Sequence, residues 1–148
     1  MEGRVKSVKR ELLIRAPVET IDRVMNDASR WPEWYAGISS ADPDDLFPQA
    51  GGKVKVVYQI MGMDFDIEFT QLSYKFANSS QLQMKGILDG ISYVELHPEN
   101  GNGNLFFDFQ YDIKNLRIGR LLERMVHKKT IKNLESSLSS LQSLIEND

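Results

Sequence analysis

The stretch from Val54 to Phe69, VKVVYQIMGMDFDIEF, decides the architecture of this chain. Apolar residues occupy alternate positions on both sides of the dipeptide Met61-Gly62, and this period of two predicts a pair of half-buried strands. A two-residue turn at that dipeptide closes the strands into a hairpin. The facing pairs are then Ile60 with Met63, Tyr58 with Phe65, and Val56 with Ile67. Both apolar sets share one face, so the sheet requires a second layer to cover it.

Further strands flank this hairpin on both sides. The predicted segments are Val8–Arg15, a strand through Leu82 and Met84 that ends near the turn dipeptide Asp89-Gly90, then Ile91–His97 and Leu105–Ile113. The run Asn100–Gly103 is a strong turn signal between the last two strands. Pairing across that turn is predicted to place Phe107 near Leu96 and Phe109 near Val94.

Helices are predicted before and after these strands. Proline in Ala16-Pro17 suits a helix start, so we expect a short helix there, a second short helix over Ala28–Tyr35, and a loop over Ala36–Gly52. A long helix is predicted from Ile118 to Ile145, about 42 Å at 1.5 Å per residue. Its apolar positions are Ile131, Leu134, Leu138, Leu141 and Ile145, with Ile118, Leu121, Leu122 and Met125 forming a further apolar face upstream. We expect this helix to lie across the width of the sheet and to cover it.

Two motifs near the start of the chain carry a family resemblance. The segments 14–21, IRAPVETI, and 27–34, DASRWPEW, resemble the opening of the polyketide cyclase/dehydrase and lipid-transport families of the START-like (SRPBCC, Bet v 1-like) superfamily. The chain departs from that pattern at Asp22, where relatives often carry tryptophan. The resemblance extends over nearly the whole chain and implies one α+β domain, residues 1-148. The implied architecture is the helix-grip fold, a curved antiparallel sheet wrapped around a long C-terminal helix, with two short helices after the first strand.

The helix-grip fold implies a cavity between sheet and helix. We expect it to bind a small hydrophobic ligand, such as a lipid, an isoprenoid or a polyketide-like compound, and to serve in its transport. Aromatic and methionine side chains make an adaptable apolar surface. The expected ligand-binding residues are Trp34, Tyr58, Phe65, Met84, Phe107, Phe109, Tyr111, Leu122 and Met125, with His127 as a polar anchor. Simple core packing is the alternative for each of them.

Composition excludes several classes of function. The chain has no cysteine and two histidines, which excludes disulfides and thiolate zinc sites. Its net charge of −3 argues against nucleic acid as a partner. We find no nucleophile or phosphate-loop motif, so no catalytic residue, metal or cofactor is predicted. Without a signal peptide or a membrane-length apolar run, a cytoplasmic location is expected.

Two alternatives to ligand binding stay open. One is an enzyme of the cyclase/dehydrase type, in which Tyr58, Tyr111 or His127 moves protons in the same cavity. The other is an interaction module like the ubiquinone-binding and co-chaperone members of the superfamily. It is motivated by the stretch from Lys114 to Lys132, which holds seven basic residues and one acidic residue. Such a stretch favours contact with an anionic membrane or an acidic partner. The oligomeric state stays open.

Overall fold

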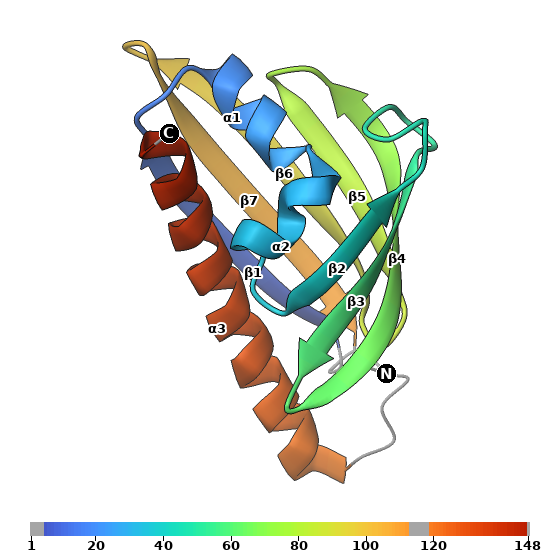
Figure 1. Ribbon diagram of the computed structural model, residues 1–148. Helices are drawn as coiled ribbons and strands as arrows, with labels where there is room; N and C mark the ends of the chain where they lie inside the picture. Colours follow the sequence, from blue (N-terminus) through green and yellow to red (C-terminus); the bar gives the residue numbers. More distant parts are fainter. Residues whose placement is uncertain (1–4, 113–118, 148) are drawn as a thin grey trace.

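A seven-stranded antiparallel sheet curves around the helices, with the strand order β1-β7-β6-β5-β4-β3-β2 (Figure 1). The computed structural model describes residues 5–112 and 119–147. The strands are β1 (Val5–Ile14), β2 (Ile38–Pro43), β3 (Lys53–Ile60), β4 (Met63–Lys75), β5 (Ser79–Lys85), β6 (Asp89–Glu99) and β7 (Asn102–Asp112). The helices are α1 (Val18–Met25), α2 (Trp31–Trp34) and α3 (Gly119–Glu146), with a 3₁₀ turn at Ala28–Arg30 before α2. This arrangement confirms the helix-grip fold and its two short helices after the first strand.

The β3–β4 hairpin has the predicted register. Ile60 pairs with Met63 and Tyr58 pairs with Phe65. Met61 and Gly62 both have positive φ, 54° and 79°. Positive φ at both central residues defines the turn whose twist matches that of the strands. The turn therefore sets the register that places the apolar residues on the concave face.

One edge strand was missed in the segment predicted as a loop. β2 lies within the segment Ala36–Gly52 and pairs with β3, with a register shift between Ile38 and Ser40. Its sequence, ISSADP, has one buried residue, Ile38, at 4 % exposure. An edge strand gains its hydrogen bonds from one neighbour and needs no apolar alternation, so the sequence carried no signal of it.

The predicted turns around β6 were wrong in two places. Asp89 and Gly90 lie inside β6, opposite Asp112 and Tyr111 of β7. The β6–β7 turn uses Asn100 and Gly101 alone, so the prediction of a longer turn shifted the register by two residues. The observed pairs are Val94 with Phe107 and Leu96 with Leu105. A shift of two preserves the face of each side chain, so the inward set was nevertheless predicted correctly.

Helix α3 runs beside β1 and is hydrogen-bonded to it. Arg10 forms an ion pair with Glu135 at 3.0 Å, and the Gln142 side chain donates to the carbonyl of Leu13 at 2.8 Å. The predicted stripe packs inward: Leu134, Leu141 and Ile145 are buried, and Ile131 and Leu138 are half-buried. This part of α3 therefore closes the open side of the sheet.

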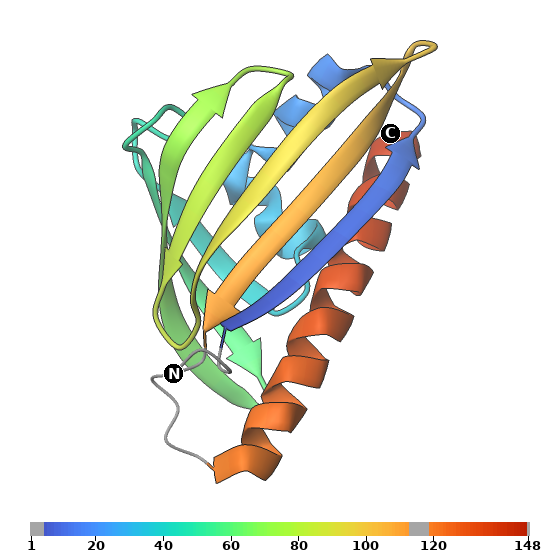
Figure 2. The same cartoon turned by 180° about the vertical axis from the view of Figure 1, so that it is seen from behind.

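The first turns of α3 project beyond the sheet, as both ribbon views show (Figures 1 and 2). Leu121, Leu122 and Met125 are 71 %, 39 % and 45 % exposed. The expectation that the whole helix lies over the sheet was wrong, because 28 residues make a helix longer than the sheet is wide at that point. Ile113 and Ile118, which the predicted elements included, lie outside the described residues. Among the described helices, none combines the length and apolar content that crossing a membrane requires.

Candidate functional site

A cavity lies between α2, α3 and the concave face of strands β5 to β7. Its volume is about 50 Å³, counted as the space open to the centres of water molecules. Its walls are mostly apolar and come from Met25, Trp31, Trp34, Tyr35, Leu82, Val94, Leu105, Phe107, Leu134, Leu138 and Leu141, with Asn26, Ser80, Ser92 and Ser137 as the polar members. We call it the first cavity.

A second cavity, of about 10 Å³ by the same measure, lies further along α3. It is lined by Tyr35, Tyr58, Ile67, Phe69, Met84, Leu88, Phe109, Thr130, Asn133 and Leu134. Tyr35 and Leu134 line both cavities, so these two side chains separate them. One water molecule needs about 10–15 Å³ by this measure. The interior therefore holds room for a few water-sized groups, and a larger guest requires side chains to move.

Helix α2 positions two tryptophans with different surroundings. Trp31 and Trp34 are three residues apart, so they share one helix face. Trp31 Nε1 donates to the carbonyl of Met25 at 2.9 Å, and its ring packs edge-on against Phe47 and Phe69. Trp34 is 8 % exposed, and its buried Nε1 has no hydrogen-bond partner within the described part of the chain.

The unpaired indole N–H matters because a buried donor without an acceptor costs roughly 1–3 kcal/mol. Trp34 lines the first cavity, whose walls are mostly apolar. Ser80 and Ser92, from neighbouring strands, add hydroxyl groups to the same cavity. The first cavity thus offers a mostly apolar surface with a few hydroxyl groups in its lining.

The second cavity carries two buried phenols. The Tyr58 hydroxyl accepts a hydrogen bond from Asn133 Nδ2 at 3.0 Å. Burial raises the pKa of Tyr58, and burial followed by the proximity of Tyr58 raises the pKa of Tyr35. Both phenols therefore stay protonated at neutral pH and can act as hydrogen-bond donors.

A phenol–imidazole pair lies next to this region. The hydroxyl of Tyr111 is hydrogen-bonded to Nδ1 of His127, and the Tyr111 ring stacks on Phe109 with 4.9 Å between centroids. Burial raises the pKa of Tyr111. Burial, and secondarily the charge of Lys6, lowers the pKa of His127, which favours the neutral imidazole. Neither residue lines the first or the second cavity.

The structure places the predicted ligand-binding residues in different surroundings. Trp34 and Phe107 line the first cavity, and Tyr58, Met84 and Phe109 line the second. Tyr111 and His127 form the adjacent pair, while Phe65 is half-buried opposite Tyr58 and lines neither cavity. Leu122 and Met125 are exposed on the projecting part of α3, so the structure does not bring them together with the others.

Several lining residues were not predicted as site residues. Tyr35 directly follows Trp34, and Leu134 belongs to the predicted helix stripe, so a signal for both was present in the sequence. Ser80 and Ser92 carried none, because a serine in a strand ordinarily faces solvent. Both are buried here, at 4 % and 9 % exposure.

The chain belongs to the polyketide cyclase / dehydrase and lipid transport family, whose model matches residues 6–146. No curated protein is similar enough in sequence to be matched to it.

Solved structures share the fold at low sequence identity. The protein TTHA0849 from Thermus thermophilus is 20% identical with a TM-score of 0.80, covering 95% of this chain and 97% of its own. The Zhui aromatase/cyclase from Streptomyces sp. R1128 is 10% identical with a TM-score of 0.80, and the match covers 96% of this chain and 94% of the aromatase/cyclase. A START superfamily protein from Mycobacterium smegmatis is 14% identical with a TM-score of 0.73, covering 95% and 97%. These likenesses show that the chain shares the fold of these proteins.

Proposed function

We propose that this protein binds a small, largely apolar molecule with one hydrogen-bond acceptor, held under α3 in the first and second cavities. The observation that supports this proposal is the mostly apolar first cavity, whose lining includes Trp34, a residue with a buried N–H that has no partner among the described residues. A guest with a carbonyl or ether oxygen would accept that hydrogen bond and remove the cost of leaving it unmade. The apolar remainder of the guest would contact Leu82, Val94 and Phe107.

The size of the cavities requires the interior to open as the guest enters. Tyr35 and Leu134 line both cavities, so a guest that extends from one cavity into the other has to displace these side chains. Enclosing about 300 Å² of apolar guest surface supplies roughly 7 kcal/mol before the costs of association. This gain has to exceed the free energy of displacing those side chains, which favours guests of modest size or flexible shape.

Binding is better supported than proton-transfer catalysis. Of the three residues predicted for a proton-transfer role, Tyr58 lines a cavity, while Tyr111 and His127 bond to each other beside it. An acid or base has to reach the reacting group within hydrogen-bond distance. In this geometry Tyr111 and His127 bond to each other and neither lines the two cavities, which favours binding over proton transfer.

The two tryptophans allow a direct test by nuclear magnetic resonance. The chain has two indole N–H groups, and each gives its own resonance. We expect a medium-chain ketone such as undecanone to shift the Trp34 resonance downfield, while undecane does not, because the hydrocarbon has no acceptor. The Trp31 resonance serves as the internal control, since its N–H is already bonded to Met25. Equal responses of Trp34 to the two compounds would contradict the proposal.

A cavity-filling variant tests the location independently. Leu138→Phe adds volume at the wall of the first cavity, whereas Leu144→Phe adds the same volume to a half-buried α3 residue outside both cavities. We expect Leu138→Phe to weaken binding of the fluorescent probe N-phenylnaphthylamine about tenfold, on the scale of 1.4 kcal/mol, and Leu144→Phe to leave it unchanged. Equal weakening by both variants would place the probe elsewhere.

A further inference from the structure

The projecting end of α3 exposes apolar side chains that no described part of the sheet covers. Leu121, Leu122 and Met125 come from its first turns, at 71 %, 39 % and 45 % exposure. Met61 and Met63, at 41 % and 55 % exposure, come from the β3–β4 turn, which reaches α3 at the same end of the molecule (Figures 1 and 2). We call these five residues the end patch.

A concentration of apolar side chains on two neighbouring elements is unusual on a solvent-exposed surface. Single exposed apolar residues are ordinary, but contiguous patches mark sites of contact with a partner or a membrane. Leucine and methionine are flexible and penetrate irregular apolar surfaces well. The end patch therefore indicates a contact surface.

The charges next to the end patch identify the kind of surface it fits. Arg120, Arg124, Lys128 and Lys129 are exposed along the same part of α3, and Glu123 is the acidic residue among them. Asp64 lies beside Met63 on the hairpin. The charge around the end patch is therefore positive, although the whole chain carries a net charge of −3. Charge complementarity thus favours an anionic partner over a second copy of this chain.

An apolar patch bordered by lysine and arginine matches the interface of an anionic lipid bilayer. Helices with this composition lie in the headgroup region, with apolar side chains inserted and cationic side chains at the phosphates. We propose that the end patch and its neighbouring cations dock the protein onto anionic membrane surfaces. The docked end adjoins the second cavity, since Thr130 and Asn133 line that cavity one to two turns further along α3.

The test is co-sedimentation with vesicles of phosphatidylcholine alone and of phosphatidylcholine mixed with an equal part of phosphatidylglycerol. We expect binding to the mixed vesicles that falls as salt is raised, and weak binding to the neutral ones. Replacing two cations in Lys128→Gln/Lys129→Gln should weaken binding roughly thirty-fold, from about 1 kcal/mol per charge near an anionic surface.

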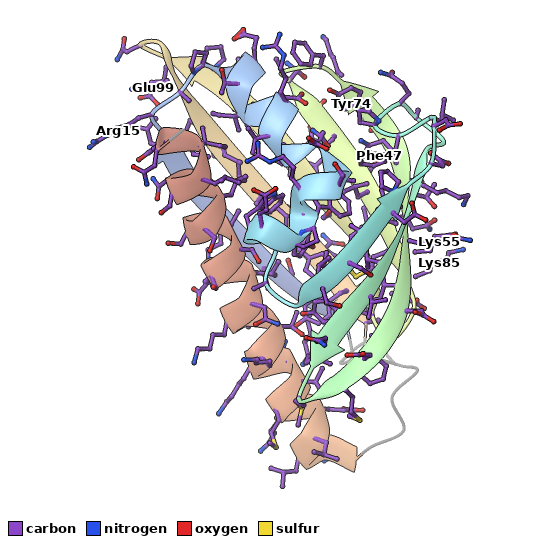
Figure 3. The ribbon with its side chains drawn as sticks, viewed as in Figure 1. Arg15, Phe47, Lys55, Tyr74, Lys85 and Glu99 are labelled. Carbon is purple, nitrogen blue, oxygen red and sulfur yellow. The ribbon has the colours of Figure 1, made fainter. Side chains whose placement is uncertain are left out.

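Matched controls are available on the opposite face of the molecule. Lys55 and Lys85 project from the outer face of the sheet, away from α3 (Figure 3). Lys55→Gln/Lys85→Gln changes the net charge equally, so we expect binding within about twofold of the parent, given the short reach of screened charges.

The apolar part of the proposal has its own control pair. Leu121→Ser should weaken vesicle binding several-fold, while Leu72→Ser, at an exposed leucine of β4, should not. Leu121 is 71 % exposed, so the thermal midpoint should stay unchanged and report an intact fold. Binding that is absent, equal for both vesicle types, or equally sensitive to the two lysine pairs would overturn the proposal. A concentration-dependent dimer lost in Leu121→Ser would also overturn it, because a second copy would then occupy the patch.

Discussion

Asp22 and Trp34 are both buried polar residues of the helical segment after β1, yet their surroundings differ. Asp22 is 2 % exposed, and its carboxylate accepts three hydrogen bonds. The donors are the Tyr74 hydroxyl at 2.8 Å, the backbone N–H of Ala77 at 2.5 Å and Asn26 Nδ2 at 3.0 Å. Figure 3 places Tyr74 at the end of β4, beside α1. The Trp34 N–H has no partner among the described residues.

The difference separates a polar group that holds the fold through hydrogen bonds from one whose donor is left without a partner among the described residues. Asp22 joins α1 to the β4–β5 turn. An acidic residue there is stable because every donor around it is used. Trp34 lines the first cavity, and its N–H has no acceptor among the described residues, so we propose that a guest supplies one when the cavity opens.

The largest effect is expected at Asp22. Asp22→Ala leaves three donors without an acceptor, so we expect the free energy of unfolding to fall by about 3 kcal/mol. Asp22→Asn keeps one acceptor oxygen, so its free energy of unfolding should fall by less. Tyr74→Phe removes a single hydrogen bond, so its free energy of unfolding should fall by about 1 kcal/mol. Urea unfolding measures all three. A loss below that of Tyr74→Phe for Asp22→Ala would show that the network does not hold α1 to the turn.

The tryptophan pair gives an intermediate effect. Trp31→Phe removes the hydrogen bond to Met25 together with ring contacts, so we expect a loss of about 2 kcal/mol. Trp34→Phe removes a donor that has no partner among the described residues. Its free energy of unfolding should therefore fall by about 1 kcal/mol less than that of Trp31→Phe. Thermal and urea unfolding of the two variants, measured under the same conditions, provide the comparison. Equal losses would mean that Trp34 has an acceptor in solution.

The smallest effect concerns His127 and the pH. Its lowered pKa means that the unfolded chain binds a proton more readily than the folded protein. The contribution of neutral His127 to the free energy of unfolding is therefore complete above the ordinary histidine pKa of about 6.5. It is lost as the pH falls from there towards the lowered pKa of the folded protein. His127→Gln should remove this part of the pH dependence of the thermal midpoint, whereas His97→Gln, at an exposed site, should retain it. Identical pH profiles for His127→Gln and the parent protein would contradict this assignment.

Much of the architecture could be predicted from local pattern. The register of the β3–β4 hairpin followed from alternation and a two-residue turn, and the inward stripe of α3 followed from spacings of three and four. The predicted β6–β7 register was wrong because Asn102 and Gly103 resemble turn residues, yet both are paired with β6 as part of β7. Strand β2 was not predicted, because an edge strand has little apolar alternation in its sequence.

The candidate site was predicted less completely than the fold. The aromatic residues Trp34, Tyr58, Phe107 and Phe109 were found because they alternate on inward faces or follow a family motif. Leu122 and Met125 were misplaced, since helical periodicity assigns a face and does not reveal where the covering sheet ends.

Most of the strands, their inward faces and the family could be predicted from the amino-acid sequence, because these depend on short-range periodicity and on motifs within a few residues. Three features became known from the packed structure: the point where α3 leaves the sheet, the position of Tyr35 and Leu134 in the lining of both cavities, and the lack of an acceptor for the Trp34 N–H among the described residues. Each of these depends on distances between segments far apart in the chain, and such distances are set by packing of the whole core.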